Sequence, residues 1–337
     1  MAITQKRARE LLRKFPKRRI LVVGDLMLDR FVYGSVERIS PEAPVPVVYV
    51  TQETSMPGGA SNVACNIRTL GGRAAVGGMI GKDAAGVELR WLLTHAGVDV
   101  ESAMMFAGAS TTVKERIIAE RQQVVRVDFE RAPTWTEKQR DTFLTMLALQ
   151  LDRADGVILE DYKKGVITQP VADLVMEMAQ RRKIPVCLDP NARSTLALSG
   201  LTLATPNRKE AFALARMTDP GPRDNPLTDK PLRQVGRLLM DKWNLEHLAI
   251  TLGAQGMYLM SRGRPPRHAP TRAREVFDVS GAGDTVIATC TMALVAGASF
   301  TEAVDLANIA AGVVIGKIGT ASCTPDELLA YMRGSRK

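Results

Sequence analysis

Several residue types and sequence features are scarce in this chain of 337 residues. It contains only three histidines and four cysteines, and the cysteines stand far apart in apolar stretches, at Cys65, Cys187, Cys290 and Cys323. They lack the close paired spacing of a zinc site or of a redox motif. We therefore expect four reduced cysteines that belong to the core.

Long apolar segments are also missing from the sequence. No run approaches the roughly 20 residues that a membrane-spanning helix needs, and no apolar segment behind a basic N-terminus resembles a secretion signal. A composition that is 45% hydrophobic allows one large core or two domains of ordinary size. These features predict a globular cytoplasmic protein with no membrane partner.

The chain has a net charge of +9, which raises the question of nucleic-acid binding. The densest basic segment is residues 1–19, where Ala8, Leu11, Leu12 and Phe15 recur at helical spacing. This spacing predicts an amphipathic surface helix with a solvated basic face. The sequence contains no zinc finger, aromatic RNA-binding signature or repeated basic stripe. We expect no nucleic-acid partner and favour a small anionic ligand.

Short apolar runs rich in β-branched residues alternate with helical stretches along most of the chain. The runs end in Gly, Pro, Asp or Asn and predict buried parallel strands at 19–25, 74–81, 156–161, 184–190, 201–207 and 247–253. Helical patterns lie between several of them, at 59–70, 83–96, 168–182 and 231–242. The fold class that follows is α/β, with a doubly wound, mostly parallel sheet that binds ligands beyond the carboxyl ends of its strands.

Two regions depart from this alternation. Residues 30–56 and 103–129 alternate apolar with polar side chains and have hairpin character, which predicts a small antiparallel β lid. The exposed face of such a lid needs a cover, so we expect a homodimer in which two lids pack together. Because no internal repeat or long linker appears, we interpret residues 1–337 as a single domain with this lid.

The segment DVSGAGDTVIATCTMALVAG, residues 278–297, places small residues in front of a predicted helix. At Gly281, Ala282 and Gly283 the bare backbone would present converging N–H groups to an anion. Gly-x-Gly also forms ordinary tight turns, and Asp284 is compatible with a plain helix cap. However, Asp284 also places a carboxylate beside the predicted anion hole. A base next to a phosphate cradle favours phosphoryl transfer.

A second glycine turn precedes a helix in PGGASNVACNIRTLGG, residues 57–72. Asn62 lies near the start of this helix, and its amide can both donate to and accept from a polyol. A helix N-cap is the ordinary structural interpretation of the same residues.

Two more stretches follow predicted strands. In TPNRKE, residues 205–210, an amide and a carboxylate three residues apart suit a hydrated Mg²⁺. In TLGAQGM, residues 251–257, glycines permit close approach to nucleotide phosphates. An exposed polar pair and a hairpin turn are the ordinary alternatives. The joint occurrence of these stretches at strand ends favours binding.

These segments resemble a known family. PGGASNVA and DVSGAGDT resemble the two signatures of the ribokinase/PfkB carbohydrate kinases, and TPNRKE and TLGAQG stand where that family has metal-linked and nucleotide-binding segments. The resemblance covers nearly the whole chain. Within the family, residues 22–48, 160–168 and 188–193 are similar to the heptose 7-phosphate 1-kinases of lipopolysaccharide inner-core synthesis.

The resemblance implies an enzyme that phosphorylates D-glycero-β-D-manno-heptose 7-phosphate at its anomeric oxygen, with ATP as donor and Mg²⁺ as cofactor. Another PfkB-type sugar, sugar-phosphate or nucleoside kinase remains the alternative. Many relatives carry a following adenylyltransferase domain with a His-x-Gly-His motif. The histidines here are His95, His247 and His268, so we expect the kinase alone.

The resemblance also assigns catalytic and sugar-binding roles. Asp284 is implied as the general base, with the N–H groups of Gly281, Ala282 and Gly283 holding the charge that develops on the γ-phosphoryl group. The residues expected at the sugar hydroxyls are Asp29, Gly58, Gly59 and Asn62. For Asp29, a solvated turn is the alternative.

For the nucleotide, the expected residues are Asn191, Asn207, Glu210, Thr251, Gly253, Gly256 and Asn308. Glu210 is expected to hold Mg²⁺ through water. Asp278 and Ser322 match positions around a monovalent-cation site, which implies activation by K⁺, although both are also compatible with simple turns.

The phosphate already on the sugar needs cations. The candidates are Lys114, Arg116, Lys163, Lys164 and Arg193, each of which also suits a solvated surface position. Ala60 follows the paired glycines where ribokinase has a lysine, which argues against free ribose as the substrate.

Two other classes fit less well. A dinucleotide oxidoreductase would need Gly-x-Gly-x-x-Gly at the first strand turn, which here reads VVGDLMLDR. A sugar or nucleotide sensor of the same fold would not need a base such as Asp284.

Overall fold

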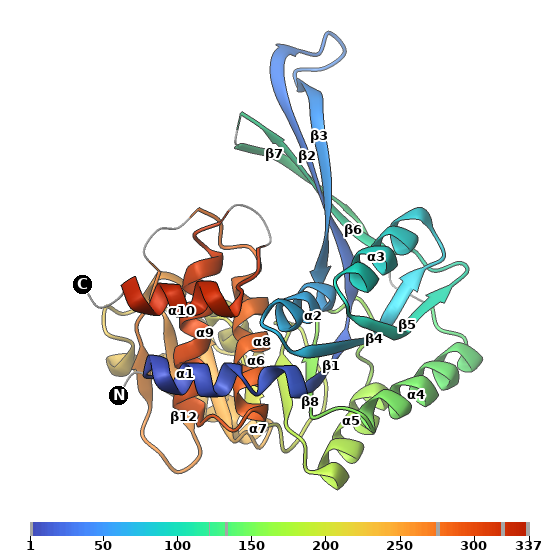
Figure 1. Ribbon diagram of the computed structural model, residues 1–337. Helices are drawn as coiled ribbons and strands as arrows, with labels where there is room; N and C mark the ends of the chain where they lie inside the picture. The colour runs from blue at the N-terminus through green and yellow to red at the C-terminus, as the bar shows by residue number, and fades with distance from the viewer. Residues whose placement is uncertain (1–2, 121, 132–133, 274–276, 318–320, 335–337) are drawn as a thin grey trace.

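The computed structural model describes residues 3–120, 122–131, 134–273, 277–317 and 321–334. Its main element is a nine-stranded sheet in the order β13-β12-β11-β10-β9-β8-β1-β4-β5 (Figure 1). The strands are β1 Arg19–Gly24, β4 Arg73–Gly81, β5 Asp99–Phe106, β8 Gly156–Glu160, β9 Val186–Asp189, β10 Leu203–Ala204, β11 His247–Thr251, β12 Met257–Ser261 and β13 Arg267–Ala269. All neighbours pair in parallel except at the β13 edge, where β12 is antiparallel to both β11 and β13.

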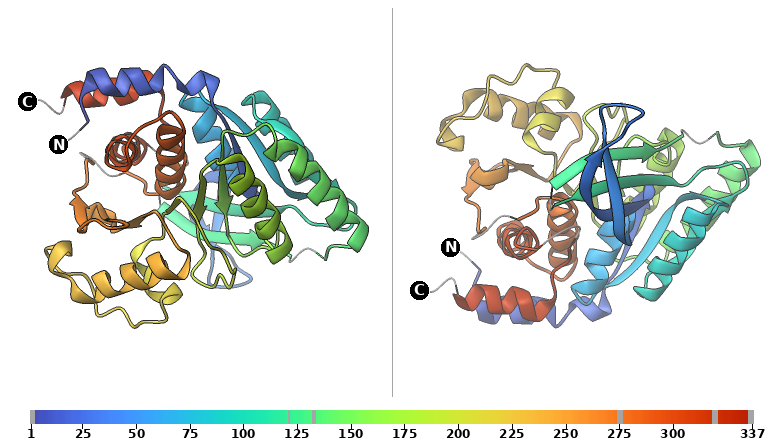
Figure 2. Two further views of the ribbon diagram at one scale, coloured as in Figure 1. Left: turned by 90° about the horizontal axis from the view of Figure 1, so that it is seen from below. Right: turned by 90° about the horizontal axis from the view of Figure 1, so that it is seen from above.

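Helices cover both faces of this sheet, as the doubly wound prediction requires (Figure 2). Ile20 and Val22 of β1 point into one core, against α1 Gln5–Leu12, α2 Ala60–Thr69, α3 Ala84–His95, α8 Ala282–Val295, α9 Phe300–Val314 and α10 Pro325–Gly334. The alternate residues Leu21 and Val23 point into the other core, against α4 Glu137–Leu151, α5 Gln169–Arg182, α6 Arg208–Leu214 and α7 Lys230–Lys242. A strand apolar on both sides is the mark of a buried parallel sheet.

A second sheet of four strands rises away from this body (Figure 1). It consists of β2 Leu26–Ile39, β3 Pro46–Gly59, β6 Thr112–Ala119 and β7 Gln122–Phe129. β2 pairs antiparallel with β3 and parallel with β6, and β6 pairs antiparallel with β7. The small sheet was predicted, but residues 103–106 were wrongly placed in it. They end β5, where Ala103 pairs with Gly78 of β4 and is buried in the main core.

Other differences from the predicted elements are local. β10 is reduced to Leu203–Ala204 within the predicted 201–207, because Pro206 has no N–H to donate and only Asn207 regains a bridge, to Thr251. The antiparallel pair β12 and β13 was not predicted. The basic N-terminal segment is helical as expected, with Ala8, Leu11 and Leu12 of α1 buried.

The state of the cysteines and the lengths of the helices can be read from the described part of the chain. All four cysteines are free, and burial raises the pKa of Cys187 to about 12. None of the described helices combines the length and the apolar character that crossing a bilayer demands.

Candidate active site

A cavity of about 240 Å³ lies where β8, β9, β10 and β11 end and α8 begins. It is therefore at the carboxyl edge of the sheet, as predicted from the fold class. The predicted site residues that line it are Asn191, Asn207, Glu210, Thr251, Gly281, Gly283 and Asp284. Residues from four separate parts of the sequence thus meet in one place.

Asp284 lies in the first turn of α8, with only 7% of its surface exposed. The Nδ2 of Asn62 donates to its Oδ2 over 2.5 Å, and the hydroxyl of Tyr162 donates to its Oδ1 over 3.1 Å. Burial raises the pKa of Asp284, while these two hydrogen bonds act in the opposite direction. Its hydrogen-bond partners Asn62 and Tyr162 are thus side chains from other elements, which distinguishes it from a plain helix cap.

The start of α8 has the backbone expected of an anion site. Gly281 is the N-cap with a φ of 76°, a left-handed conformation that glycine adopts without strain. Among the described residues, no side chain caps this helix end. The N–H of Ala282 donates to the carbonyl of Val279 over 3.3 Å, so among the described residues the N–H groups of Gly281 and Gly283 remain for a ligand.

Asn62 is oriented by a short chain of hydrogen bonds within α2 and α8. Asn66 donates its Nδ2 to the Oδ1 of Asn62 over 3.2 Å, and Thr285 donates its hydroxyl to the Oδ1 of Asn66 over 2.9 Å. These bonds fix the amide of Asn62 so that its nitrogen faces Asp284. Neither Asn66 nor Thr285 was predicted, since helical spacing alone marks them as ordinary core positions.

Tyr162 was also missed, together with the residue that positions its loop. Asp25, directly after β1, is buried and accepts hydrogen bonds from the backbone N–H groups of Tyr162, Lys164 and Val166 at 3.0, 3.0 and 3.1 Å. Burial raises the pKa of Asp25, and the three N–H groups counter it. Its position after a buried strand was a usable signal, but such an aspartate in sequence looks like the start of a turn.

Two further carboxylates border the cavity beside Asp284. Glu160 ends β8 and Asp189 ends β9, and one ligand oxygen from each lies within 4.8 Å of the other and of an oxygen of Asp284. Burial, then the neighbouring negative charges, raise the pKa of both Glu160 and Asp189. Grouped carboxylate oxygens are the ligands that Mg²⁺ prefers, so these residues fit the metal that the resemblance implies.

Asn207 and Glu210 form a capping box at the start of α6. Asn207 N–H donates to the Oε2 of Glu210 over 2.8 Å, and Glu210 N–H donates to the Oδ1 of Asn207 over 2.9 Å. This capping box was not predicted, and both side chains also line the cavity. Burial raises the pKa of Glu210, and Asn207 counters the effect.

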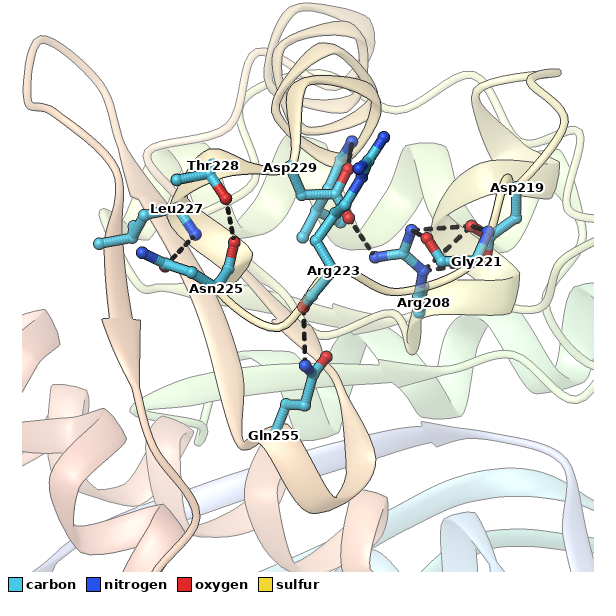
Figure 3. A network of polar contacts seen from close by, with 10 residues as sticks. Arg208, Asp219, Gly221, Arg223, Asn225, Leu227, Thr228, Asp229 and Gln255 are labelled. Carbon is cyan, nitrogen blue, oxygen red and sulfur yellow. Dashed lines mark hydrogen bonds and ion pairs between the residues drawn. The ribbon is translucent and has the colours of Figure 1, made fainter.

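The residue after Asn207 anchors this end of α6 (Figure 3). Arg208 pairs with Asp219 and Asp229, both at 2.8 Å, and donates to the carbonyl of Gly221. The Nε2 of Gln255 donates to the carbonyl of Arg223 over 2.8 Å, which ties the turn after β11 to the same segment. The network thus connects the two stretches expected at the nucleotide.

The remaining nucleotide candidates differ in their surroundings. Gly253 has a φ of 59° and open space where a side chain would project, whereas a side chain at Gly256 would strike the carbonyl of Ala269. Asn308 donates to the carbonyl of Pro270 over 2.7 Å and accepts from the N–H of Arg272 over 3.2 Å. Close packing against Ala269 therefore accounts for a glycine at position 256. The side chain of Asn308 holds the backbone of residues 270–272 in place.

At the sugar end, Asp29 lies in β2 and is buried, with its Oδ1 2.7 Å from the Nη1 of Arg116 in β6. The solvated-turn alternative for Asp29 is thus wrong. Gly58 pairs with Met27, and a side chain there would collide with Asp29. Gly59, with a φ of 55°, is the N-cap of α2.

The predicted phosphate-binding cations have different partners. The Nζ of Lys114 lies 5.0 Å from the centre of the Tyr162 ring, and burial lowers its pKa. Lys164 pairs with Glu130, whereas Lys163 and Arg193 are exposed. Lys114 thus contacts Tyr162, which is itself hydrogen-bonded to Asp284.

The two monovalent-cation candidates lie near residues outside the described ranges, 274–276 and 318–320. Asp278 accepts a hydrogen bond from the N–H of Ser280 over 2.9 Å. Ser322 donates its hydroxyl to that of Thr69 over 3.1 Å, and its carbonyl accepts from Lys317. These contacts fit the turn interpretation and leave the cation prediction untested.

A doubly wound sheet with a buried aspartate at an uncapped helix start defines a class of phosphoryl-transfer enzyme, and residues 17–327 match the model of the pfkB family carbohydrate kinases. The chain belongs to this family and is a sugar kinase.

Among curated relatives, the chain is 43% identical over 321 residues to the bifunctional protein HldE of Caulobacter vibrioides, covering 94% of this chain and 64% of the relative. It is 45% identical over 316 residues to the bifunctional protein HldE of Halorhodospira halophila, with the same shares covered. The chain thus spans under two thirds of the length of these relatives.

Solved structures show the same fold at low identity. Ribokinase of Arabidopsis thaliana, complexed with ribose and ATP, has a TM-score of 0.75 at 20% identity, covering 94% of this chain and 99% of that one. Phosphofructokinase-2 of Escherichia coli, in complex with potassium, has a TM-score of 0.73 at 22% identity with the same coverage.

Proposed function

We propose that this chain transfers the γ-phosphoryl group of ATP to the anomeric oxygen of D-glycero-β-D-manno-heptose 7-phosphate, giving the 1,7-bisphosphate. The observation that carries the proposal is Asp284, buried beside the uncapped start of α8 and held by Asn62 and Tyr162. The heptose is supported by the similarity to HldE proteins and by the heptose-kinase-like segments at 22–48, 160–168 and 188–193. Such a reaction belongs to lipopolysaccharide synthesis in the cytoplasm.

In the proposed mechanism, Asp284 takes the proton of the anomeric hydroxyl as its oxygen attacks the γ-phosphorus. The bond from this phosphorus to the β,γ-bridging oxygen breaks, and ADP leaves. Asn62 and Tyr162 hold the carboxylate in place and stabilise its charged form. The backbone N–H groups of Gly281, Ala282 and Gly283 stabilise the charge on the transferring group.

Cations take part in this proposal in two ways. Mg²⁺ bound beside Glu210 would neutralise charge on the ATP phosphates, and Asn207 keeps Glu210 oriented through the capping box. K⁺ is proposed as an activator near Asp278 and Ser322.

We assign the 7-phosphate to Lys114 and Arg116 rather than to the whole predicted set. Both lie on β6, and Arg116 contacts the proposed sugar ligand Asp29. Each charge-assisted contact to a phosphate is worth roughly 1.5–3 kcal/mol before solvent screening.

The four-stranded sheet is proposed to pair with that of a second copy in a homodimer. Large apolar residues are exposed on it, namely Ile39, Tyr49, Val50, Val124, Val125 and Phe129. Sedimentation of the native chain and of Val125→Glu tests this, with a dimer expected only for the native chain.

The test of the proposed function is ATP consumption with heptose 7-phosphate and with the same heptose lacking its phosphate. We expect kcat/KM for the phosphorylated sugar to be at least about 10²-fold higher, since two charge-assisted contacts are lost without the phosphate. Phosphorus NMR should place the new group on the anomeric oxygen. Equal rates, or a preference for ribose, fructose 6-phosphate or a nucleoside, would leave only the general sugar-kinase assignment.

A further inference from the structure

A second cavity, of about 790 Å³, lies at the amino end of the sheet, and the proposed phosphoryl transfer does not use it. Its walls come from the segment after α5, the start of β11, the turn between β12 and β13, and the start of α9. His247, the first residue of β11, lines this cavity, whereas Thr251, the last, lines the active-site cavity. Small-molecule sites usually have volumes of roughly 300–1,000 Å³, so this space suits a whole metabolite.

The charge of this cavity is mainly positive. The cations that line it are Lys183, Arg262, Arg264 and Arg267. Among the described residues, none of these four forms an ion pair with a carboxylate. Glu246, whose side chain is 66% exposed, is the one carboxylate among the described lining residues. Four cations around one space, with a single acidic neighbour, favour an anionic ligand.

Two of these arginines are held in place by neutral acceptors. Arg267 donates from its Nη1 to the hydroxyl of Thr301 over 3.1 Å. Arg262 donates to the carbonyl of Leu245 over 3.2 Å and to the Oδ1 of Asn244 over 2.8 Å. A guanidinium group has five N–H donors, so each arginine keeps donors for a ligand. Because their positions are already restrained, both arginines lose less freedom when a ligand binds.

The other lining residues suit a sugar better than a nucleotide base. The side chains that offer hydroxyl groups, which both donate and accept hydrogen bonds, are Thr202, Ser261, Ser299 and Thr301. The rings of His247 and Phe300 lie parallel with their centres 4.3 Å apart, so each ring covers one face of the other. Phe300 is also buried. Among the described lining residues, this aromatic pair is therefore closed to a base.

From these observations we propose that the amino-end cavity is a second, non-catalytic binding site for a phosphorylated sugar. Arg262 and Arg267 contact its phosphate groups, and the hydroxyl side chains contact the sugar. The proposed substrate and product belong to this chemical class, and that link alone rests on the proposed function. β11 and α8 both reach from this cavity to the active site, since the last turn of α8 lies here and its first turn lies beside Asp284. A bound sugar phosphate would thus contact two elements that form the active site.

The experiment is isothermal titration calorimetry of the full chain with fructose 1,6-bisphosphate, in the presence of chelator and without nucleotide. Arg267→Ala and Arg262→Ala should each weaken binding at least about fivefold, a modest factor because both side chains are exposed and solvent screens their charge. Arg267→Lys keeps the charge and should lose less affinity than Arg267→Ala. Arg333→Ala removes an exposed arginine in the last turn of α10, so it is the matched control and should bind like the native chain.

Lys114→Ala separates this site from the active site, because Lys114 is assigned to the phosphate of the substrate. One bound probe per chain should persist in Lys114→Ala, and thermal melts check that every variant is folded. Inorganic phosphate should bind at least about tenfold more weakly than the probe, since it lacks the hydroxyl groups and the second phosphate.

Three results would overturn the inference. They are no binding of the bisphosphate by the native chain, binding that falls in Lys114→Ala but not in Arg267→Ala or Arg262→Ala, and equal affinity for inorganic phosphate. Because the titration measures no turnover, it is separate from the test of the proposed function. A different sugar as the substrate would leave its outcome unchanged.

Discussion

The two ends of the nine-stranded sheet carry cavities of opposite character. At the amino end, a cavity of about 790 Å³ is lined by the cations Lys183, Arg262, Arg264 and Arg267. At the carboxyl end, the cavity of about 240 Å³ holds buried carboxylates. Judged by volume and charge alone, the amino-end cavity would be the better binding site for an anionic ligand.

The helices that begin at these cavities explain why the smaller one is the better candidate. At the amino end, α9 is closed by a capping box, in which Ser299 caps the N–H of Glu302 and Glu302 accepts from the N–H of Ser299 over 2.8 Å. At the carboxyl end, α8 begins at Gly281 with no side-chain cap among the described residues. Free helix N–H groups beside a positioned base are thus found only at the smaller of these two cavities.

The largest expected effect comes from removing the base. Asp284→Asn keeps the size of the side chain and its bond to Tyr162 but cannot take a proton, so kcat should fall by roughly 10²–10⁴-fold. Steady-state kinetics with a matched thermal melt provides the measurement. Near-native turnover in a folded variant would show that Asp284 is not the base. The smaller cavity would then lose the feature that favours it over the larger one.

A smaller effect is expected from the residue that holds the base. Tyr162→Phe deletes the 3.1 Å hydrogen bond to the Oδ1 of Asp284, and we expect kcat to fall about tenfold with little change in the KM for ATP. Tyr49→Phe, which removes an exposed hydroxyl on the four-stranded sheet, is the control. An unchanged kcat in Tyr162→Phe would make this contact incidental to catalysis.

The smallest effect is expected at the amino end. Arg264 is exposed and lines the larger cavity, so Arg264→Ala should change kcat/KM for the sugar phosphate less than about twofold. The same assay on Lys114→Ala gives the comparison, where KM for the sugar phosphate should rise. A strong loss in Arg264→Ala would show that the amino-end cavity takes part in substrate binding.

The sequence was sufficient to predict the alternating strands and helices, because their apolar periodicity follows directly from burial on both faces of the sheet. The sequence also drew attention to Asp284 and Asn62, because each stands beside a glycine turn that opens a helix, and the fold brings their side chains into hydrogen-bonding contact. Residues 103–106 were assigned to the wrong sheet. Alternation of apolar and polar side chains is typical of an edge strand, and both sheets have such strands.

Tyr162, Asp25, Glu160 and Asp189 were missed for a different reason. Each follows or ends a buried strand, where an acidic or aromatic residue has the appearance of an ordinary strand end. Only strand order brings them together: β8 lies between β1 and β9, which places Glu160 beside both Gly24 and Asp189. By contrast, Asn207 and Glu210 were predicted to belong to the site, but the capping box that they form was not predicted.

The most direct test of the central claim is a crystal structure of Asp284→Asn with a non-hydrolysable ATP analogue and heptose 7-phosphate. The account predicts the γ-phosphoryl group at the N–H groups of Gly281, Ala282 and Gly283, with the anomeric oxygen within hydrogen-bonding distance of residue 284. A nucleotide in the amino-end cavity beside Arg264, or an anomeric oxygen turned away from residue 284, would contradict it.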